Sequence, residues 1–235
     1  MSLAFCPILA EIVERKETYG RSGKRLDLGS LSTTNNLLTL RELHLATKAK
    51  RTLEVGLAMG GSGLVFTQTH KDLDSSPQRQ HVAIDPFQRS RWIDEAGLVA
   101  IEKAGLVDYL DFKEAPSCLI LPELLKAGKR FDLVYIDGSH LFEDVFIDFD
   151  YTARILDAGG IVLFDDSVDP HVHNTLRFIR KNLPHSLREL DLSPYRRHQS
   201  KFVYRVACAI GKSQLTAFQK IAGPLREWNC SYRDF

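Results

Sequence analysis

The stretch from Arg51 to Phe66 constrains the fold more than any other part of the chain, and it reads Arg-Thr-Leu-Glu-Val-Gly-Leu-Ala-Met-Gly-Gly-Ser-Gly-Leu-Val-Phe. Its short apolar run, residues 51–55, predicts a strand, and the apolar residues after it predict the start of a helix. Glycines at positions 56, 60, 61 and 63 predict a backbone that turns through positive φ or lies against a bulky group. Ser62 is a candidate N-cap, which would direct free helix N–H groups toward the loop. The stretch therefore predicts a ligand-binding turn.

Size and charge exclude several classes of protein. A chain of 235 residues suits one large domain. Its 31 basic and 30 acidic residues leave a net charge of +1, which does not favour nucleic acid or an acidic membrane as a partner. The four cysteines form no C-x-x-C pair, residues 3–13 fit an amphipathic helix better than a signal peptide, and no apolar run approaches the roughly 18 residues of a membrane span. We expect a cytoplasmic protein that binds a small molecule.

Strand and helix patterns alternate along the chain. Apolar runs predict strands over residues 51–55, 81–85, 109–112, 131–137 and 161–166, with helical spacing before, between and after them. This order predicts an α/β fold with a doubly wound, mostly parallel sheet. Two more strands, residues 187–192 and 202–209, are expected to form an antiparallel edge hairpin, which gives seven strands in all.

We expect the α/β domain to occupy residues 37–210. Before it, residues 1–36 are predicted to form a helix and a polar, glycine-bearing loop, a candidate lid or dimer contact. After it, residues 211–235 have helical apolar spacing and are predicted to form a helical tail. A lid, a homodimer contact and an extension of the core are the alternatives for these two terminal segments.

Carboxylates stand at the expected ends of the strands, where ligands of doubly wound folds bind. The glycine loop is close to a dinucleotide fingerprint, so an NAD(P)-dependent oxidoreductase is one alternative. However, Glu54 would repel a pyrophosphate, and Asp85 lies 29 residues after Gly56, where the fingerprint expects an acid after about 20. Glu54 suits a cationic amine instead, and Asp85 suits the two hydroxyls of a ribose.

Four motifs in this order resemble those of class I S-adenosylmethionine-dependent methyltransferases: Leu53–Gly63, Ala83–Pro86, Phe131–His140 and Gly159–Asp166. The subgroup most similar to them contains small-molecule O-methyltransferases of the antibiotic-tailoring type. The resemblance implies a Rossmann-like methyltransferase fold and S-adenosylmethionine as the cofactor.

The resemblance also implies where the cofactor would bind. Its methionine part would lie in the loop that contains Gly56, Ala58, Gly60, Gly61 and Ser62. Glu54 would lie near its amine, Asp85 would hold its ribose, Glu114 would flank its adenine, and Asp137 would also lie beside it. This chain departs from the common G-x-G-x-G pattern at Ala58 and at the doubled glycine.

Asp137, Asp165 and Asp166 end two strands that this fold places side by side. Three carboxylates so close together need a cation to stay ionised, and oxygen ligands suit Mg²⁺ or a similar divalent ion. The resemblance implies acids at matching positions in metal-dependent O-methyltransferases. The alternative is structural: Asp137 would order its own turn, Asp165 would cap a loop and Asp166 would be solvated.

His140, three residues after Asp137, has a side chain suited to removing a proton from a hydroxyl. Alternatively, it caps the helix that follows. With His140 and Asp137 as catalytic residues, we expect S-adenosylmethionine-dependent O-methylation of a small molecule, assisted by a divalent metal. A catalytically silent subunit that binds the cofactor and acts through interactions is the alternative outside the enzymes.

Overall fold

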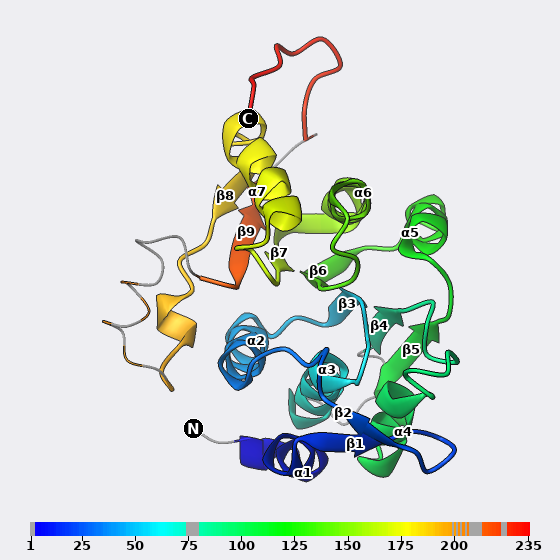
Figure 1. Ribbon diagram of the computed structural model, residues 1–235. Coiled ribbons are helices and arrows are strands. Elements are labelled where there is room, and N and C mark those ends of the chain that lie inside the picture. Colours follow the sequence, from blue (N-terminus) through cyan, green and yellow to red (C-terminus); the bar gives the residue numbers. More distant parts are fainter. Residues whose placement is uncertain are drawn as a thin grey trace.

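The computed structural model describes residues 3–73, 80–198, 213–221 and 225–235, together with residues 200, 202, 204 and 206. Its centre is a seven-stranded sheet in the order β5-β4-β3-β6-β7-β9-β8 (Figure 1). The strands are β3 (Arg51–Val55), β4 (Gln80–Ile84), β5 (Leu110–Lys113), β6 (Phe131–Ile136), β7 (Leu156–Phe164), β8 (Leu187–Glu189) and β9 (Thr216–Lys220). The strands from β3 to β7 are parallel, and β9 is antiparallel to both β7 and β8. The predicted doubly wound sheet with an antiparallel edge is confirmed.

Helices cover both faces of this sheet (Figure 1). On one face lie α2 (Thr34–Thr47), α3 (Gly61–Leu73) and α4 (Ala96–Lys103), and on the other lie α5 (Ser117–Lys126), α6 (Phe142–Ile155) and α7 (Pro170–Asn182). Side chains of β6 alternate between the two cores: Leu133 and Tyr135 pack with the first group, Val134 and Ile136 with the second. A central parallel strand buried on both faces explains the continuous apolar run in the sequence.

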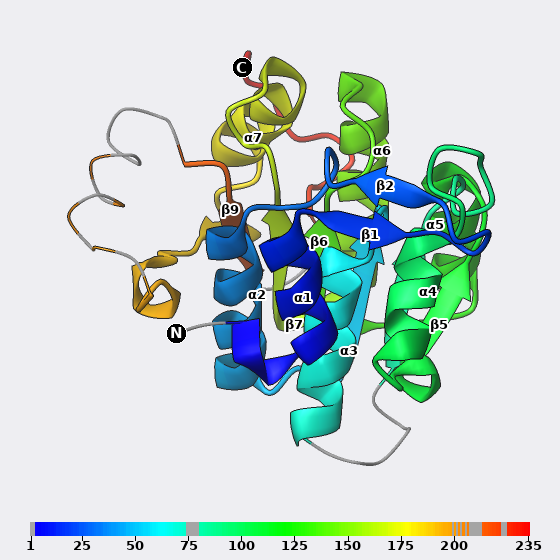
Figure 2. The same cartoon turned by 60° about the horizontal axis from the view of Figure 1, so that its bottom comes forward.

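The N-terminal segment contains more regular structure than the sequence pattern indicates. After η1 (Leu3–Phe5) and α1 (Pro7–Arg15), strands β1 (Glu17–Tyr19) and β2 (Arg25–Asp27) pair as a small antiparallel sheet. β1 packs against α1 and α4 (Figure 2). Strands of three residues are too short to give a readable alternation, which is why only a loop was expected here.

The second strand of the edge hairpin was placed wrongly. Of the predicted strand 202–209, the described residues 202, 204 and 206 have helical backbone, and the remaining positions lie outside the described residues. The strand that pairs with β8 is β9, within the segment predicted to be a helical tail. Leu215 and Phe218 are three residues apart, a spacing that fits a helix, but β9 is buried between β7 and β8 with apolar side chains on both faces.

The helical spacing that follows the predicted strand 81–85 extends from residue 91 to residue 104, but α4 begins only at Ala96. The preceding turn contains Asp94 and Glu95 with left-handed φ values of 50° and 58°. None of the helices in the described part of the chain is long and apolar enough to cross a membrane.

Candidate active site

The glycine loop joins β3 to α3 at the carboxyl end of the parallel strands, as predicted. Gly56 has φ +94°, and a Cβ atom there would overlap the carbonyl oxygen of Asp137 at the end of β6. Gly60 has φ +83°, and its Cβ would lie 2.8 Å from the Cα of Gly97 on α4. Both glycines are therefore required by the packing of the chain itself, before any ligand is considered. α3 begins at Gly61, so Ser62 lies in the first helical turn and not at the predicted N-cap.

Ala58, where this chain departs from the common G-x-G-x-G pattern, has a φ of +43° in the left-handed region. Two side chains hold it there. The N–H of Ala58 donates to Asp85 Oδ2 at 2.7 Å, and its carbonyl oxygen accepts from Gln88 Nε2 at 2.7 Å. These bonds offset the cost of the left-handed conformation in a residue that has a Cβ.

Asp85 connects the end of β4 to the glycine loop. Its Oδ2 accepts from the N–H groups of Leu57 (3.1 Å) and Ala58, and its Oδ1 accepts from the N–H of Phe87 at 2.7 Å. The side chain is nearly buried. The acid predicted to hold a ribose thus fixes the shape of the neighbouring loop, and its role toward a cofactor stays a prediction.

Glu54 lies deeper than expected. It is completely buried, and its Oε1 is 2.9 Å from His81 Nε2 on β4. His81 Nδ1 is in turn 2.8 Å from the hydroxyl of Thr52. A Cβ at Gly63 would lie 3.0 Å from Glu54 Oε1, so the carboxylate sits behind the first turn of α3. Its charge acts on the loop from beneath.

Two further residues of the predicted cofactor site, Glu114 and Gly61, lie near the carboxyl ends of the parallel strands. Glu114, after β5, forms an ion pair with Arg89 and accepts from the Arg89 N–H at 3.2 Å, which joins the loops after β4 and β5. Gly61 lies against Leu31, whose Cδ1 atom would overlap a Cβ at that position. Most residues predicted to bind the cofactor therefore lie in the loops after β3, β4 and β5, whereas Glu54 is buried within β3 and Asp137 follows β6.

Asp137 and Asp165 share a buried polar cluster. The hydroxyl of Ser32 lies 2.9 Å from an oxygen of each carboxylate, and the Tyr135 hydroxyl donates to Asp165 at 2.6 Å. Asn36 Nδ2 donates to the other oxygen of Asp165 at 2.7 Å. Burial, and then the nearby Asp165 charge, raise the pKa of Asp137 well above its usual value. A buried guanidinium adjoins the cluster, because Arg196 Nη2 donates to Asn36 Oδ1 at 3.3 Å.

Three members of this cluster were missed by the sequence analysis. Ser32, Asn36 and Tyr135 were not among the predicted site residues. Thr33 does cap α2, since its side chain accepts from the Asn36 N–H at 3.3 Å. Tyr135 is completely buried, and burial followed by the charges of Asp137 and Asp165 raises the pKa of its hydroxyl.

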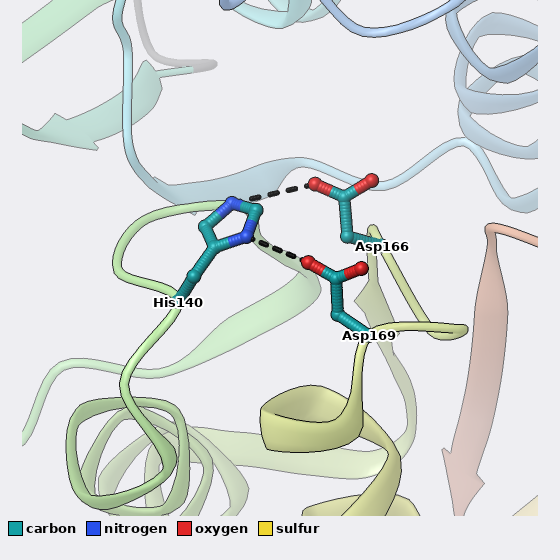
Figure 3. Close-up of side chains that lie close together, drawn as sticks. All are labelled: His140, Asp166 and Asp169. Atoms are coloured by element: carbon teal, nitrogen blue, oxygen red, sulfur yellow. Dashed lines mark hydrogen bonds and ion pairs between the residues drawn. The ribbon is translucent and has the colours of Figure 1, made fainter.

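Asp166 turns away from this cluster toward His140. Figure 3 shows the imidazole between two carboxylates: Nε2 lies 3.4 Å from Asp166 Oδ2, and Nδ1 lies 2.9 Å from Asp169 Oδ2. Burial and the Asp165 charge raise the pKa of Asp166, and His140 opposes this. Asp169 was not among the predicted site residues.

The three predicted metal ligands therefore do not converge on one point. Among the described residues, the side chains whose possible ligand atoms all lie within 4.8 Å of one another are His140, Asp166 and Asp169. Asp137 and Asp165 form a separate, adjoining pair. The raised pKa of Asp137 and the oxygen-only donors of that pair nevertheless fit a hard divalent cation, which would add positive charge beside the two carboxylates.

This fold is the Rossmann-like methyltransferase fold. The O-methyltransferase TomG from Streptomyces achromogenes, solved in complex with SAM, aligns with a TM-score of 0.64 and 16% identity over 94% of this chain and 91% of that one. An O-methyltransferase from Bacillus cereus, solved with SAH, aligns with a TM-score of 0.62 and 17% identity over 91% of each chain.

The sequence comparison points to the same class. Residues 53–167 match the family described as "Methyltransferase domain", which confirms the resemblance. The chain is 30% identical over 125 residues to caffeoyl-CoA O-methyltransferase 1 of Eucalyptus globulus, covering 51% of this chain and 46% of the relative. For caffeoyl-CoA O-methyltransferase of Petroselinum crispum, the identity is 32% over 126 residues, covering 51% and 47%. The chain spans about half the length of these curated relatives.

Proposed function

We propose that the protein transfers a methyl group from S-adenosylmethionine to a hydroxyl oxygen of a small molecule. The observation that carries this proposal is the juxtaposition at one sheet edge of a glycine loop pinned by Asp85 and an acid cluster that contains Asp137 and Asp165. A carboxylate-anchored loop suits a nucleoside with a zwitterionic tail, and the acids beside it suit a reacting hydroxyl and its counter-ion. The matches to O-methyltransferases support the same reaction.

The proposed cofactor contacts follow the order of the loops. The methionine part would lie against the backbone from Gly56 to Ser62, with the buried charge of Glu54 beneath it. Asp85 would hold the ribose through the remaining capacity of its carboxylate, because Oδ1 has one described donor while Oδ2 has several. Glu114 would lie beside the adenine.

His140 is the proposed general base. In the tautomer that this proposal requires, the Nδ1–H of His140 donates a hydrogen bond to Asp169 Oδ2, which leaves Nε2 to take the proton of the acceptor hydroxyl. The acceptor oxygen then forms a bond to the methyl carbon as the carbon–sulfur bond breaks, and S-adenosylhomocysteine leaves. Asp166 and Asp169 stabilise the imidazolium that results. Alignment of the oxygen with the methyl group is the main further requirement.

Asp137 and Asp165 would hold a divalent cation such as Mg²⁺, whereas Asp166, the third acid of the predicted metal site, points toward His140. When bound, the ion would act as a Lewis acid that lowers the pKa of the acceptor hydroxyl and orients its oxygen. Ser32 and Tyr135 keep the Asp137 and Asp165 carboxylates close together at the entrance of this site.

Calorimetry with S-adenosylhomocysteine and NAD⁺, each titrated into the protein, tests the proposal. We expect binding of S-adenosylhomocysteine and no heat from NAD⁺. Heat from NAD⁺ alone would favour the oxidoreductase alternative. Binding of S-adenosylhomocysteine without methyl transfer to any of a panel of mono- and dihydroxylated aromatic acceptors would favour a catalytically silent binding subunit.

A cytoplasmic location, the absence of nucleic acid as a partner and a homodimer are also part of the proposal. The nearly balanced charge supports the absence of nucleic acid as a partner, because it provides no attraction for a polyanion. Light scattering on the purified protein would decide the oligomeric state.

A further inference from the structure

Gln88 lies in the turn between β4 and α4 and is completely buried. Its amide nitrogen Nε2 donates to two acceptors, the carbonyl oxygen of Ala58 at 2.7 Å and Asp85 Oδ2 at 3.2 Å. Ala58 is the left-handed residue of the glycine loop, and Asp85 is the acid that anchors this loop. One side chain therefore bridges the two groups that set the shape of the cofactor turn.

The orientation of this amide is determined by its surroundings. If the amide were turned over, its oxygen would face two acceptor oxygens, so the nitrogen must point toward Ala58 and Asp85. The oxygen Oε1 points toward Gly97, where a Cβ atom would lie 3.1 Å away, and it is buried without a hydrogen-bond partner in the described structure. Burying an unpartnered oxygen is unfavourable, so the contribution of Gln88 comes from its N–H donors.

The backbone of Gln88 is held as firmly as its side chain. Its carbonyl oxygen accepts from the Glu95 N–H at 2.6 Å, across the turn that leads into α4. The amide is thus fixed from the side of α4 and presented to the loop. Gly60 also approaches Gly97, which places Gln88 on the side of the loop that packs against α4.

We propose that Gln88 is a positioning residue that holds the Ala58 turn and the Asp85 carboxylate in the geometry that receives the cofactor. This inference rests on the proposed function. Without the two N–H donors, the Ala58 carbonyl loses its described partner, and the Asp85 carboxylate keeps only backbone donors. The turn would then be less ordered in the free protein and would become ordered only when the cofactor binds. The free-energy cost of this ordering would weaken the affinity for the cofactor.

Two variants separate the donors from the shape of the side chain. Gln88→Met keeps the length and removes the donors, and Gln88→Glu keeps the shape and places a second carboxylate beside Asp85. The matched control is Gln219→Leu, which removes an amide that donates to the Gly159 carbonyl at 3.0 Å, toward the opposite end of the sheet. The probe is S-adenosylhomocysteine, measured by calorimetry on the full chain.

We expect Gln88→Met to bind S-adenosylhomocysteine roughly tenfold more weakly than the wild type, and Gln88→Glu more weakly still, with Gln219→Leu within about twofold of the wild type. In turnover, KM for S-adenosylmethionine should rise while kcat at saturating cofactor stays near the wild-type value. A merely structural role would instead lower kcat through loss of folded protein and leave KM unchanged.

Equal affinity of the wild type and of folded Gln88→Met would overturn the role of Gln88. A wild type that does not bind S-adenosylhomocysteine would instead overturn the proposed function. If Gln88→Met does not fold, Gln88→Glu with a native circular dichroism spectrum decides the question by the same comparison.

Discussion

At the scale of single residues, two of the acids at the strand ends fix the local backbone. Asp85 accepts from the N–H of Ala58, and Asp165 accepts from the N–H of Asp166. Their positions were predictable because each follows an apolar strand directly. The hydrogen-bond partners of these acids were not predictable. Ser32 and Asp137, for example, are 105 residues apart, and no local pattern connects them. Gln88 was missed for the same reason.

His140→Ala should lower kcat by about 100-fold or more, because a general base contributes roughly 10²–10⁴-fold to a proton transfer. The measurement is methyl transfer from labelled S-adenosylmethionine to whichever hydroxylated acceptor is active with the wild type. The matched control is His171→Ala, which removes an exposed histidine near the start of α7 and should leave kcat unchanged. Equal rates for the wild type and His140→Ala would exclude His140 as the general base and leave it as a structural partner of Asp166 and Asp169, since it does not cap α6.

Gly56→Ala should destabilise the fold by about 3 kcal/mol or more, because the new Cβ would overlap the Asp137 carbonyl in a residue with φ +94°. Gly23→Ala is the control for backbone strain alone. Gly23 has φ +81° but nothing within 4 Å of an added Cβ, so we expect a cost of about 1 kcal/mol. The measurement is the free energy of unfolding of the two variants in urea. A similar loss of free energy in both would contradict the prediction, because it would mean that the added Cβ at Gly56 causes no steric cost beyond backbone strain.

At the scale of elements, the order of strands and helices around the parallel sheet follows from apolar periodicity. The predicted secondary structure is wrong where an element is too short to show a periodicity or where its periodicity is ambiguous. β1 and β2 contain three residues each, and β9 carries apolar residues at a helix-like spacing although it lies in the sheet. Pairing with β7 decides the conformation of β9, and this long-range interaction is invisible to a local pattern.

The buried carboxyl group of Asp148, on the inner face of α6, leads to a prediction about the pH dependence of stability. Burial is the main cause that raises its pKa from 3.8 to about 6, and Asp144 adds to it while Ser117 opposes it. Because the folded pKa lies above the unfolded value, the stabilising effect of the protonated form is complete below pH 3.8 and is lost as the pH rises toward 6.

Asp148→Asn should therefore increase the free energy of unfolding by up to about 3 kcal/mol at pH 8 and change it little at pH 4. Urea unfolding at the two pH values is the measurement. Asp150→Asn, on the same helix but in an exposed ion pair with Arg154, is the control and should show no comparable gain at pH 8. A gain of equal size at both pH values would contradict the titration of Asp148.

At the scale of the whole molecule, the site is assembled from the loops at one edge of the sheet, together with the chain around Ser32. The sequence was sufficient to place the site at the carboxyl ends of the strands, since a parallel sheet brings these ends together. It was not sufficient to determine which acids face one another. Asp165 and Asp166 are adjacent in sequence, yet they contact different partners because Asp166 adopts a left-handed φ of 46°.

Metal and cofactor should stabilise the molecule together. S-adenosylhomocysteine at 100 times its Kd should raise the free energy of unfolding by about 2.7 kcal/mol, and Mg²⁺ should add to this. Removing the metal with a chelator should lower the rate of methyl transfer at least 100-fold, with recovery on addition of Mg²⁺.

Asp165→Asn should lose the response to Mg²⁺ in both thermal denaturation and turnover. Asp111→Asn, in an exposed ion pair with Lys113 on β5, should retain it. Full activity of the wild type in chelator would remove the metal from the proposed mechanism.

The position of β9 also has a consequence for the order in which the chain is synthesised. β8 precedes β9 in the chain, yet β9 lies between β8 and β7 in the sheet. On a ribosome, β8 would emerge without its neighbour and could join the sheet only after residues 216–220 had been added. A chain that stopped before Thr216 would thus lose two strands from the sheet and leave the edge of β7 exposed to pairing with other chains.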